Sequence, residues 1–160
     1  MIEKEELDSL LPHKGRMLLL TRIVEYNLEE RVLCAEYSIT RDCLFYDSSI
    51  EGVPAWVGFE FLAQAISALS GLSGRAKGEK PKIGFILSVS SIKIKLPFFK
   101  PGSIVKLTVK ESGRVEQVYS FDGEVFLEDR KVLEGKLTVM DVDDEQVTSL
   151  VKTKVQNSID

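Results

Sequence analysis

Glu60 is the residue whose surroundings most favour chemistry, because it lies within an otherwise apolar stretch, residues 52–74. Gln64 and Ser67 follow it at spacings of four and three, which places the three side chains along one stripe of a helix. A carboxyl group buried there must find a partner or stay protonated, since an unpaired buried charge is very costly. Glu60 is therefore a candidate general acid, and Gln64 is a candidate to orient it or a substrate. The competing interpretation is a structural Glu60 that is hydrogen-bonded to nearby backbone.

His13 is the only histidine of the chain and follows Pro12 in a polar loop. Imidazole exchanges protons near neutral pH without any special environment. If imidazole chemistry occurs in this protein, His13 performs it. A loop histidine that is an exposed bystander or a structural hydrogen-bonding group remains the alternative.

The apolar stretch around Glu60 predicts one long helix, over about residues 54–72. Pro54 suits the first turn of a helix, and Gly71 and Gly74 suit its end. Because nearly every face is apolar, Trp56 included, we expect this helix to be buried. Its length is close to that of a membrane span, but Glu60 and a second polar residue lie near its middle, so we expect a core helix of a soluble protein.

Composition limits the classes of function. With 160 residues, 44% of them hydrophobic, the chain can bury one good core. A net charge of −4 argues against a nucleic-acid-binding surface. Cys34 and Cys43 have no metal-binding spacing, so we expect reduced thiols in a cytoplasm and a reaction without metal or cofactor. The first 11 residues are too charged for a signal peptide.

The order of expected elements predicts an α+β protein. An amphipathic helix over about residues 2–11 precedes strands at 17–26 and 31–39, the central helix, and strands at 83–96, 104–110, 117–127 and 131–142, with turns at 111–113 and 128–130. The expected single domain covers residues 1–142, and residues 143–160 form a polar tail.

Short connections between these strands favour an antiparallel sheet. A helix that is apolar all round needs apolar cover all round, and a curved sheet wrapped around it supplies part of that cover. This arrangement is the hotdog fold. A second copy would cover the remaining face and the sheet edge, so we expect at least a homodimer.

Three motifs resemble one enzyme family. Residues 11–20, LPHKGRMLLL, resemble the LPHxxPMLLL opening of 3-hydroxyacyl-[acyl-carrier-protein] dehydratases. The run from Pro54 through Glu60 to Gln64 is similar to their central helix, PxxxGxExxAQ, and residues 98–102, FFKPG, are similar to their F-basic-x-Pro-Gly turn. The FabZ-like members carry a histidine in an HFPGxP loop, whereas residues 45–52 here contain none. The closer likeness is to the ApeP-like dehydratases of aryl polyene clusters.

The resemblance implies dehydration of 3-hydroxyacyl thioesters, carried on acyl carrier protein, to trans-2-enoyl thioesters. It implies catalysis by His13 and Glu60 and substrate binding by four further residues, Gln64, Gly58, Val57 and Pro54. Backbone N–H groups at the start of the helix would hold the thioester oxygen. The missing loop histidine leaves two alternatives open: a hotdog thioesterase, or a non-catalytic subunit that binds a catalytic hotdog partner or the carrier protein.

Three lysines form a local basic cluster in this acidic protein: Lys93, Lys95 and Lys100. An ordinary solvated strand face is the simpler interpretation. The functional interpretation is a docking patch for the acidic carrier protein, where complementary charge would speed encounter.

Overall fold

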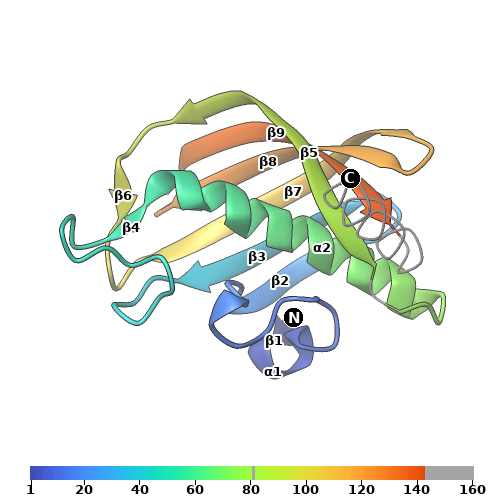
Figure 1. Ribbon diagram of the computed structural model, residues 1–160, viewed down its shortest axis with the longest axis horizontal. Coiled ribbons are helices and arrows are strands. Elements are labelled where there is room, and N and C mark those ends of the chain that lie inside the picture. Colours follow the sequence, from blue (N-terminus) through green and yellow to red (C-terminus); the bar gives the residue numbers. More distant parts are fainter. Residues whose placement is uncertain (81, 143–160) are drawn as a thin grey trace, which may run out of the picture.

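The computed structural model describes residues 1–80 and 82–142, and it shows a curved antiparallel sheet around one long helix (Figure 1). The strand order is β1-β2-β3-β7-β8-β9-β5. The strands of this sheet are β1 (Ile2–Glu3), β2 (Arg22–Asn27), β3 (Val32–Ser38), β5 (Ile83–Ile94), β7 (Ile104–Val115), β8 (Val118–Leu127) and β9 (Arg130–Val142). Two short strands, β4 (Val53–Pro54) and β6 (Phe98–Phe99), pair separately, and the helices are α1 (Lys4–Leu7) and α2 (Gly58–Ala76).

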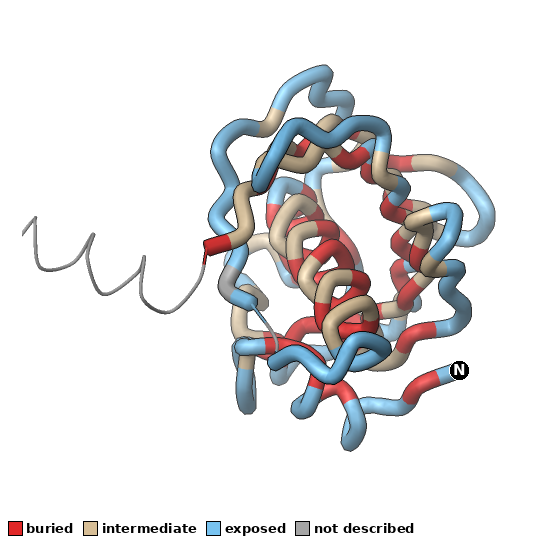
Figure 2. Tube along the Cα trace, turned by 90° about the vertical axis from the view of Figure 1, so that its right-hand side faces the viewer, coloured by how far each residue is buried: buried red, intermediate tan, exposed pale blue. Residues whose placement is uncertain are grey.

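Helix α2 lies inside the curve of the sheet, where most of its residues are buried (Figure 2). Apolar side chains from β3, β7, β8 and β9 complete this core, which confirms the predicted hotdog fold. The segment Ala55–Ala76 is long and apolar enough to span a membrane, yet 67% of its most apolar window is buried within the protein. That burial is typical of a core helix. Trp56 departs from the expectation, because it is 62% exposed.

The ends of the central helix differ from those predicted. A 3-10 turn, Ala55–Val57, precedes α2, which continues past Gly71 and Gly74. A Cβ atom on Gly71 would lie 2.2 Å from the Leu10 carbonyl oxygen, so this glycine permits a close approach of the N-terminal segment instead of ending the helix. The helix ends at Ala76, and Gly78, two residues later, has a positive φ of 71°, which suits the left-handed backbone that follows a helix terminus.

The N-terminal segment is less regular than predicted. Only Lys4–Leu7 is helical, because Ile2–Glu3 pairs with β2 as a short edge strand. The strand expected from residue 17 begins at Arg22, after a 3-10 turn at Gly15–Met17. The three leucines between them are buried without joining the sheet (Leu18, Leu19 and Leu20). Their apolar run therefore predicted burial correctly and strand structure wrongly.

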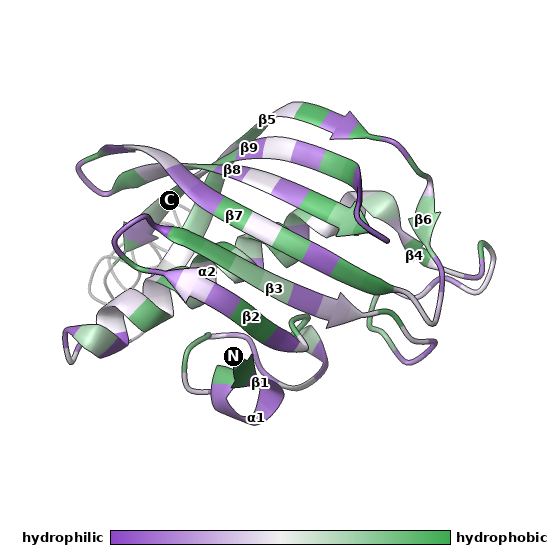
Figure 3. Ribbon diagram, turned by 180° about the vertical axis from the view of Figure 1, so that it is seen from behind, coloured by the Kyte–Doolittle hydropathy of each residue, from purple (hydrophilic) through white to green (hydrophobic). Residues whose placement is uncertain are grey.

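The strands after α2 follow the predicted order, with one turn displaced. Strands β7 and β8 continue to a tight turn between Val115 and Val118, so the turn expected at residues 111–113 is wrong. The turn at residues 128–130 is confirmed, where Glu128 and Asp129 both have positive φ. Apolar and polar bands alternate along these strands (Figure 3), as expected of strands with one buried face. The expected polar tail lies outside the described residues.

Candidate active site

The Gln64 side chain joins the N-terminal segment to helix α2. It is fully buried, and its Oε1 accepts a 2.8 Å hydrogen bond from the Leu19 N–H. Its Nε2 donates to the Met17 carbonyl oxygen at 2.8 Å and to Oε1 of Glu60 at 3.0 Å. A buried amide with all of these bonds made holds its neighbours in one geometry. Gln64 therefore fixes the Glu60 carboxylate relative to the segment that carries His13.

His13 lies directly beside Glu60. Its Nε2 is 3.6 Å from Oε1 of Glu60, and the two side chains are 28% and 33% exposed. The Nδ1 atom of His13 is buried and has no hydrogen-bond partner among the described residues. Glu60 is thus half-buried at the edge of a cavity, rather than enclosed as its apolar stretch predicted. The reason is that the face of α2 that carries Glu60 is turned toward the cavity between this helix and β5.

The cavity at this pair has a volume of about 120 Å³ and separates α2 from strands β5 and β9. Pro12, His13 and Glu60 lie at one part of its wall, and apolar and small side chains make up much of the rest. The lining is completed by Ala63, Ile66, Ser67, Ser70, Lys82, Gly84, Ile86, Val139 and Asp141. An imidazole and a carboxyl group at the wall of a partly apolar cavity can act together as base and acid on a bound substrate.

Several predicted site residues lie elsewhere. Pro54 pairs with Phe98 between β4 and β6, and Val57 is buried in the core. A Cβ atom on Gly58 would meet Leu133 at 2.9 Å, so this glycine faces the sheet. None of Pro54, Val57 and Gly58 lines the described cavity.

The start of the central helix offers fewer oxyanion donors than expected. The Ala55 N–H donates to the Pro97 carbonyl, and the Gly58 N–H donates to the Ala55 carbonyl within the 3-10 turn. Both groups therefore already have partners within the chain.

No local sequence pattern predicted the residues of the cavity wall opposite the helix. Ile86, Val139 and Asp141 come from strands far from Glu60 in the sequence, and only the sheet pairing of β5 with β9 brings them to the cavity. Ser70 was detectable, because it continues the helical stripe of Glu60 and Ser67 by a further three residues.

The lysine cluster lies on and after β5. Lys93 forms a 2.7 Å ion pair with Glu134. Hydrogen bonds from Lys131 and Lys93 lower the pKa of the Glu134 carboxyl group to about 2. Lys95 and Lys100 are exposed. The cluster does not line the cavity at His13 and Glu60.

The chain resembles known proteins both in sequence and in structure. The sequence profile of the ApeP-like family, described as ApeP dehydratase, matches residues 5–151. The 3-hydroxyacyl-[acyl-carrier-protein] dehydratase FabZ of Chlamydia trachomatis serovar L2 is 28% identical over 146 residues, which cover 89% of this chain and 94% of the relative. FabZ of Anaeromyxobacter sp. (strain K) is 26% identical over 143 residues, which cover 88% of this chain and 90% of the relative.

Solved structures share the fold. The dehydratase heterocomplex ApeI:P from Xenorhabdus doucetiae superposes with a TM-score of 0.83 at 23% identity, covering 91% of this chain and 96% of the other. A hypothetical thioesterase with coenzyme A from Streptococcus pneumoniae TIGR4 has a TM-score of 0.58 at 11% identity, and the match covers 76% of this chain and 84% of the other. Both likenesses agree with the hotdog fold. Because the family profile covers nearly the whole described chain, this protein belongs to the ApeP-like dehydratase family.

Proposed function

We propose that this protein dehydrates 3-hydroxyacyl thioesters, carried on acyl carrier protein, to trans-2-enoyl thioesters. The observation that carries this proposal is the 3.6 Å approach of His13 to Glu60 at the wall of a cavity. Membership of a dehydratase family and relatives named as 3-hydroxyacyl-[acyl-carrier-protein] dehydratases supply the reaction and the substrate class.

The reaction needs one base and one acid. The neutral imidazole of His13 removes a proton from C2 of the acyl chain, and the Glu60 carboxyl group protonates the hydroxyl on C3, which leaves as water. The C2–H electron pair forms the double bond, so the product is the enoyl thioester. The closeness of Nε2 and Oε1 lets the proton pass from the imidazolium back to the carboxylate, which restores both groups. Gln64 acts as a positioning residue through its 3.0 Å hydrogen bond to Glu60.

A direct experiment supplies 3-hydroxyacyl and saturated acyl thioesters side by side. A dehydratase converts the first to an enoyl thioester, detected by its absorbance and mass, and leaves the second intact. Release of free thiol from both substrates, with no enoyl product, would contradict the proposal and favour the thioesterase alternative.

We further propose that Lys93, Lys95 and Lys100 receive the carrier protein. Among the described residues, no ion pair holds Lys95 or Lys100, so their charges are available to an acidic partner. Lys93 is shared with Glu134 and contributes less. Complementary charge of this kind raises the association rate more than it tightens the complex.

We also propose that a second hotdog chain covers β5. This strand is the edge of the seven-stranded sheet, and its 12 residues include five exposed apolar side chains: Phe85, Ile86, Leu87, Ile92 and Ile94. A long apolar edge strand is a site for pairing with another chain. A second copy would give a homodimer, and a different hotdog subunit would give a heterocomplex. Light scattering of the protein alone, followed by co-purification with neighbouring gene products, distinguishes the two.

The pathway follows from the substrate class only in outline. The enoyl product suits fatty-acid or polyene-type chain building, including aryl polyene synthesis. Free Cys34 and Cys43 fit the reducing cytoplasm in which such chain building would occur.

A further inference from the structure

A second cavity of about 90 Å³ lies beside the cavity at His13 and Glu60, nearer the end of α2. Ser70, Lys82 and Asp141 line both cavities. The helix residues along them recur at spacings of three or four on one face: Glu60, Ala63, Ser67, Ser70, Gly74 and Lys77. The two cavities therefore adjoin along α2, and together they are called here the α2 groove.

The chemistry of the α2 groove changes along its length. Ala63, Ile66, Ile86 and Val139 line the part next to Glu60, where a hydrocarbon chain would lose water-exposed apolar surface. The far part is polar and mainly cationic. Five of its eleven lining residues carry positive charge (Arg31, Lys77, Lys80, Lys82 and Arg114), and two are acidic (Glu79 and Asp141). This excess stands out in a chain of net charge −4.

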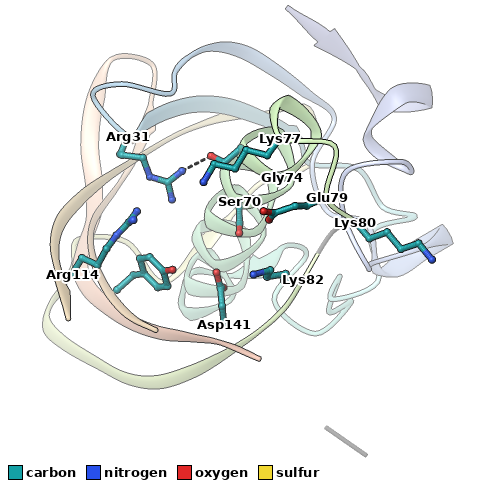
Figure 4. Close-up of a pocket in the computed structure, with 11 residues that line it drawn as sticks. Arg31, Ser70, Gly74, Lys77, Glu79, Lys80, Lys82, Arg114 and Asp141 are labelled. Atoms are coloured by element: carbon teal, nitrogen blue, oxygen red, sulfur yellow. Dashed lines mark hydrogen bonds between the residues drawn. The ribbon is translucent and has the colours of Figure 1, made fainter. Parts of the chain in front are cut away.

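Two arginines at the far part are held in place by a shared carboxylate. Arg31 donates from Nε to Glu111 at 2.7 Å, and Arg114 donates to both Glu111 oxygens at 3.0 and 3.1 Å. Arg31 also donates from Nη1 to the Ser73 hydroxyl on α2. Each guanidinium has five N–H donors, so both retain donors after these bonds. Figure 4 shows the two guanidinium groups turned toward the cavity, whereas Lys80 points away from it.

The geometry points to an acyl chain with an acidic group at its far end. We propose, building on the dehydratase function above, that the preferred substrates are 3-hydroxyacyl thioesters with a terminal carboxylate, which Arg31 and Arg114 bind. Fixed arginine forks suit planar carboxylates. The apolar residues of the first part, Ala63, Ile66, Ile86 and Val139, give a hydrocarbon chain surface to pack against.

The length of the groove sets the length of the chain. Ser70 and Ser73 lie 10 and 13 residues after Glu60, which corresponds to about 15 and 20 Å along α2. Along an extended hydrocarbon chain each C–C bond of about 1.5 Å advances by only about 1.3 Å, so roughly 12 to 16 bonds cover these distances. Shorter chains would not reach the arginines.

The test compares pantetheine thioesters of 3-hydroxy chains with 16 or with 8 carbons, ending in a carboxylate or a methyl group, each with and without the 4′-phosphate. For the wild-type protein we expect kcat/KM to favour the carboxylate over the methyl group by at least ~10-fold at 16 carbons, and to show no such preference at 8. Arg114→Gln should abolish the preference. Arg22→Gln is the matched control, because Arg22 is a similarly exposed strand residue paired with Glu36 and lines neither cavity.

Binding separates this inference from the proposed reaction. Dissociation constants of the same thioesters are measured by calorimetry with Glu60→Gln, in which turnover is blocked. Tighter binding of the 16-carbon carboxylate supports the inference even if no enoyl product ever forms. Equal binding of the carboxylate and methyl chains overturns it. It is also overturned if Arg114→Gln weakens binding only of the thioesters that carry the 4′-phosphate, whatever group ends the chain. If Arg114→Gln does not fold, Arg31→Gln, which replaces the other arginine of the proposed site, provides the second variant.

Discussion

Nε2 of His13 lies 3.6 Å from Oε1 of Glu60 within one chain, although the two residues are 47 positions apart. A hotdog dimer could in principle have formed this pair across two subunits. Because one chain holds both groups, the acid–base pair proposed here needs no residue from a second subunit. At 3.6 Å the two atoms need only a small further approach to form a hydrogen bond, through which the proposed mechanism returns the proton between turnovers.

Replacement of either member of the pair should remove dehydratase activity. Glu60→Gln keeps shape and hydrogen bonding but has no transferable proton, and His13→Ala removes the base. Each should lower the rate by ~10²–10⁴-fold. The double variant should be little worse than either single variant, because residues that act as a unit are not additive. Circular dichroism checks folding, and full activity of a well-folded His13→Ala protein would exclude the histidine from the mechanism.

Gln64→Leu should destabilise the fold as well as the site. It leaves the buried Leu19 N–H and the Met17 carbonyl without their hydrogen-bond partner. Each such group costs about 1–3 kcal/mol, so urea denaturation should show a loss of about 2–6 kcal/mol in the free energy of unfolding. Gln117→Leu, in the exposed turn before β8, is the control and should change stability little. A similar change in both proteins would contradict the positioning role.

Charge reversal of Lys95 and Lys100 should affect only carrier-bound substrate. The double variant should turn over carrier-bound thioester more slowly, with a smaller effect at high salt because screening weakens the wild-type attraction. A short diffusible thioester should be unaffected. Lys110→Glu, an exposed lysine on β7, serves as the charge control. Equal losses on both substrates would assign the lysines to folding or to chemistry.

The Arg31–Glu111–Arg114 cluster should make stability depend on acidity. Burial alone would raise the pKa of the Glu111 carboxyl, but hydrogen bonds from Arg114 and Arg31 outweigh it and hold that pKa below its ordinary value. A carboxylate whose pKa is lower in the folded than in the unfolded protein stabilises the fold at pH values above its unfolded-state pKa of about 4.3. This stabilisation is lost as the pH falls through the folded-state pKa. The difference in unfolding free energy between wild type and Glu111→Gln should therefore shrink below about pH 4.3. A difference that stays constant from pH 7 to pH 3 would refute this origin.

The exposed edge strand predicts an assembly that buries well over ~1,000 Å². Light scattering should show at least a dimer at micromolar concentration, and Ile92→Lys on β5 should shift it toward monomer. Ile104→Lys is the matched control, since Ile104 on β7 is also 51% exposed. A monodisperse wild-type monomer would rule out self-association through β5 and leave a different hotdog chain as the partner.

The sequence determined the features that depend on local pattern. Helical spacing placed Glu60, Gln64 and Ser67 on one stripe, and the short connections between the strands indicated the antiparallel sheet. Side-chain periodicity reports which face is buried, and this information is carried by neighbouring residues alone. Local patterns predicted the ends of the elements less well. Gly71 suggested a helix terminus, but in the structure it lies within the helix and permits the close approach of Leu10.

Only the tertiary structure decided which distant groups meet. The irregular course of residues 17–21 places Met17 and Leu19 on Gln64, and this contact brings His13 to Glu60. The pairing of β5 with β9 supplies the opposite wall of the α2 groove, and Glu111 gathers Arg31 and Arg114 at its far end. Such distances follow from how loops close and how sheets pack around the helix. No periodic pattern in the chain encodes them, because each depends on segments that are separated by tens of residues.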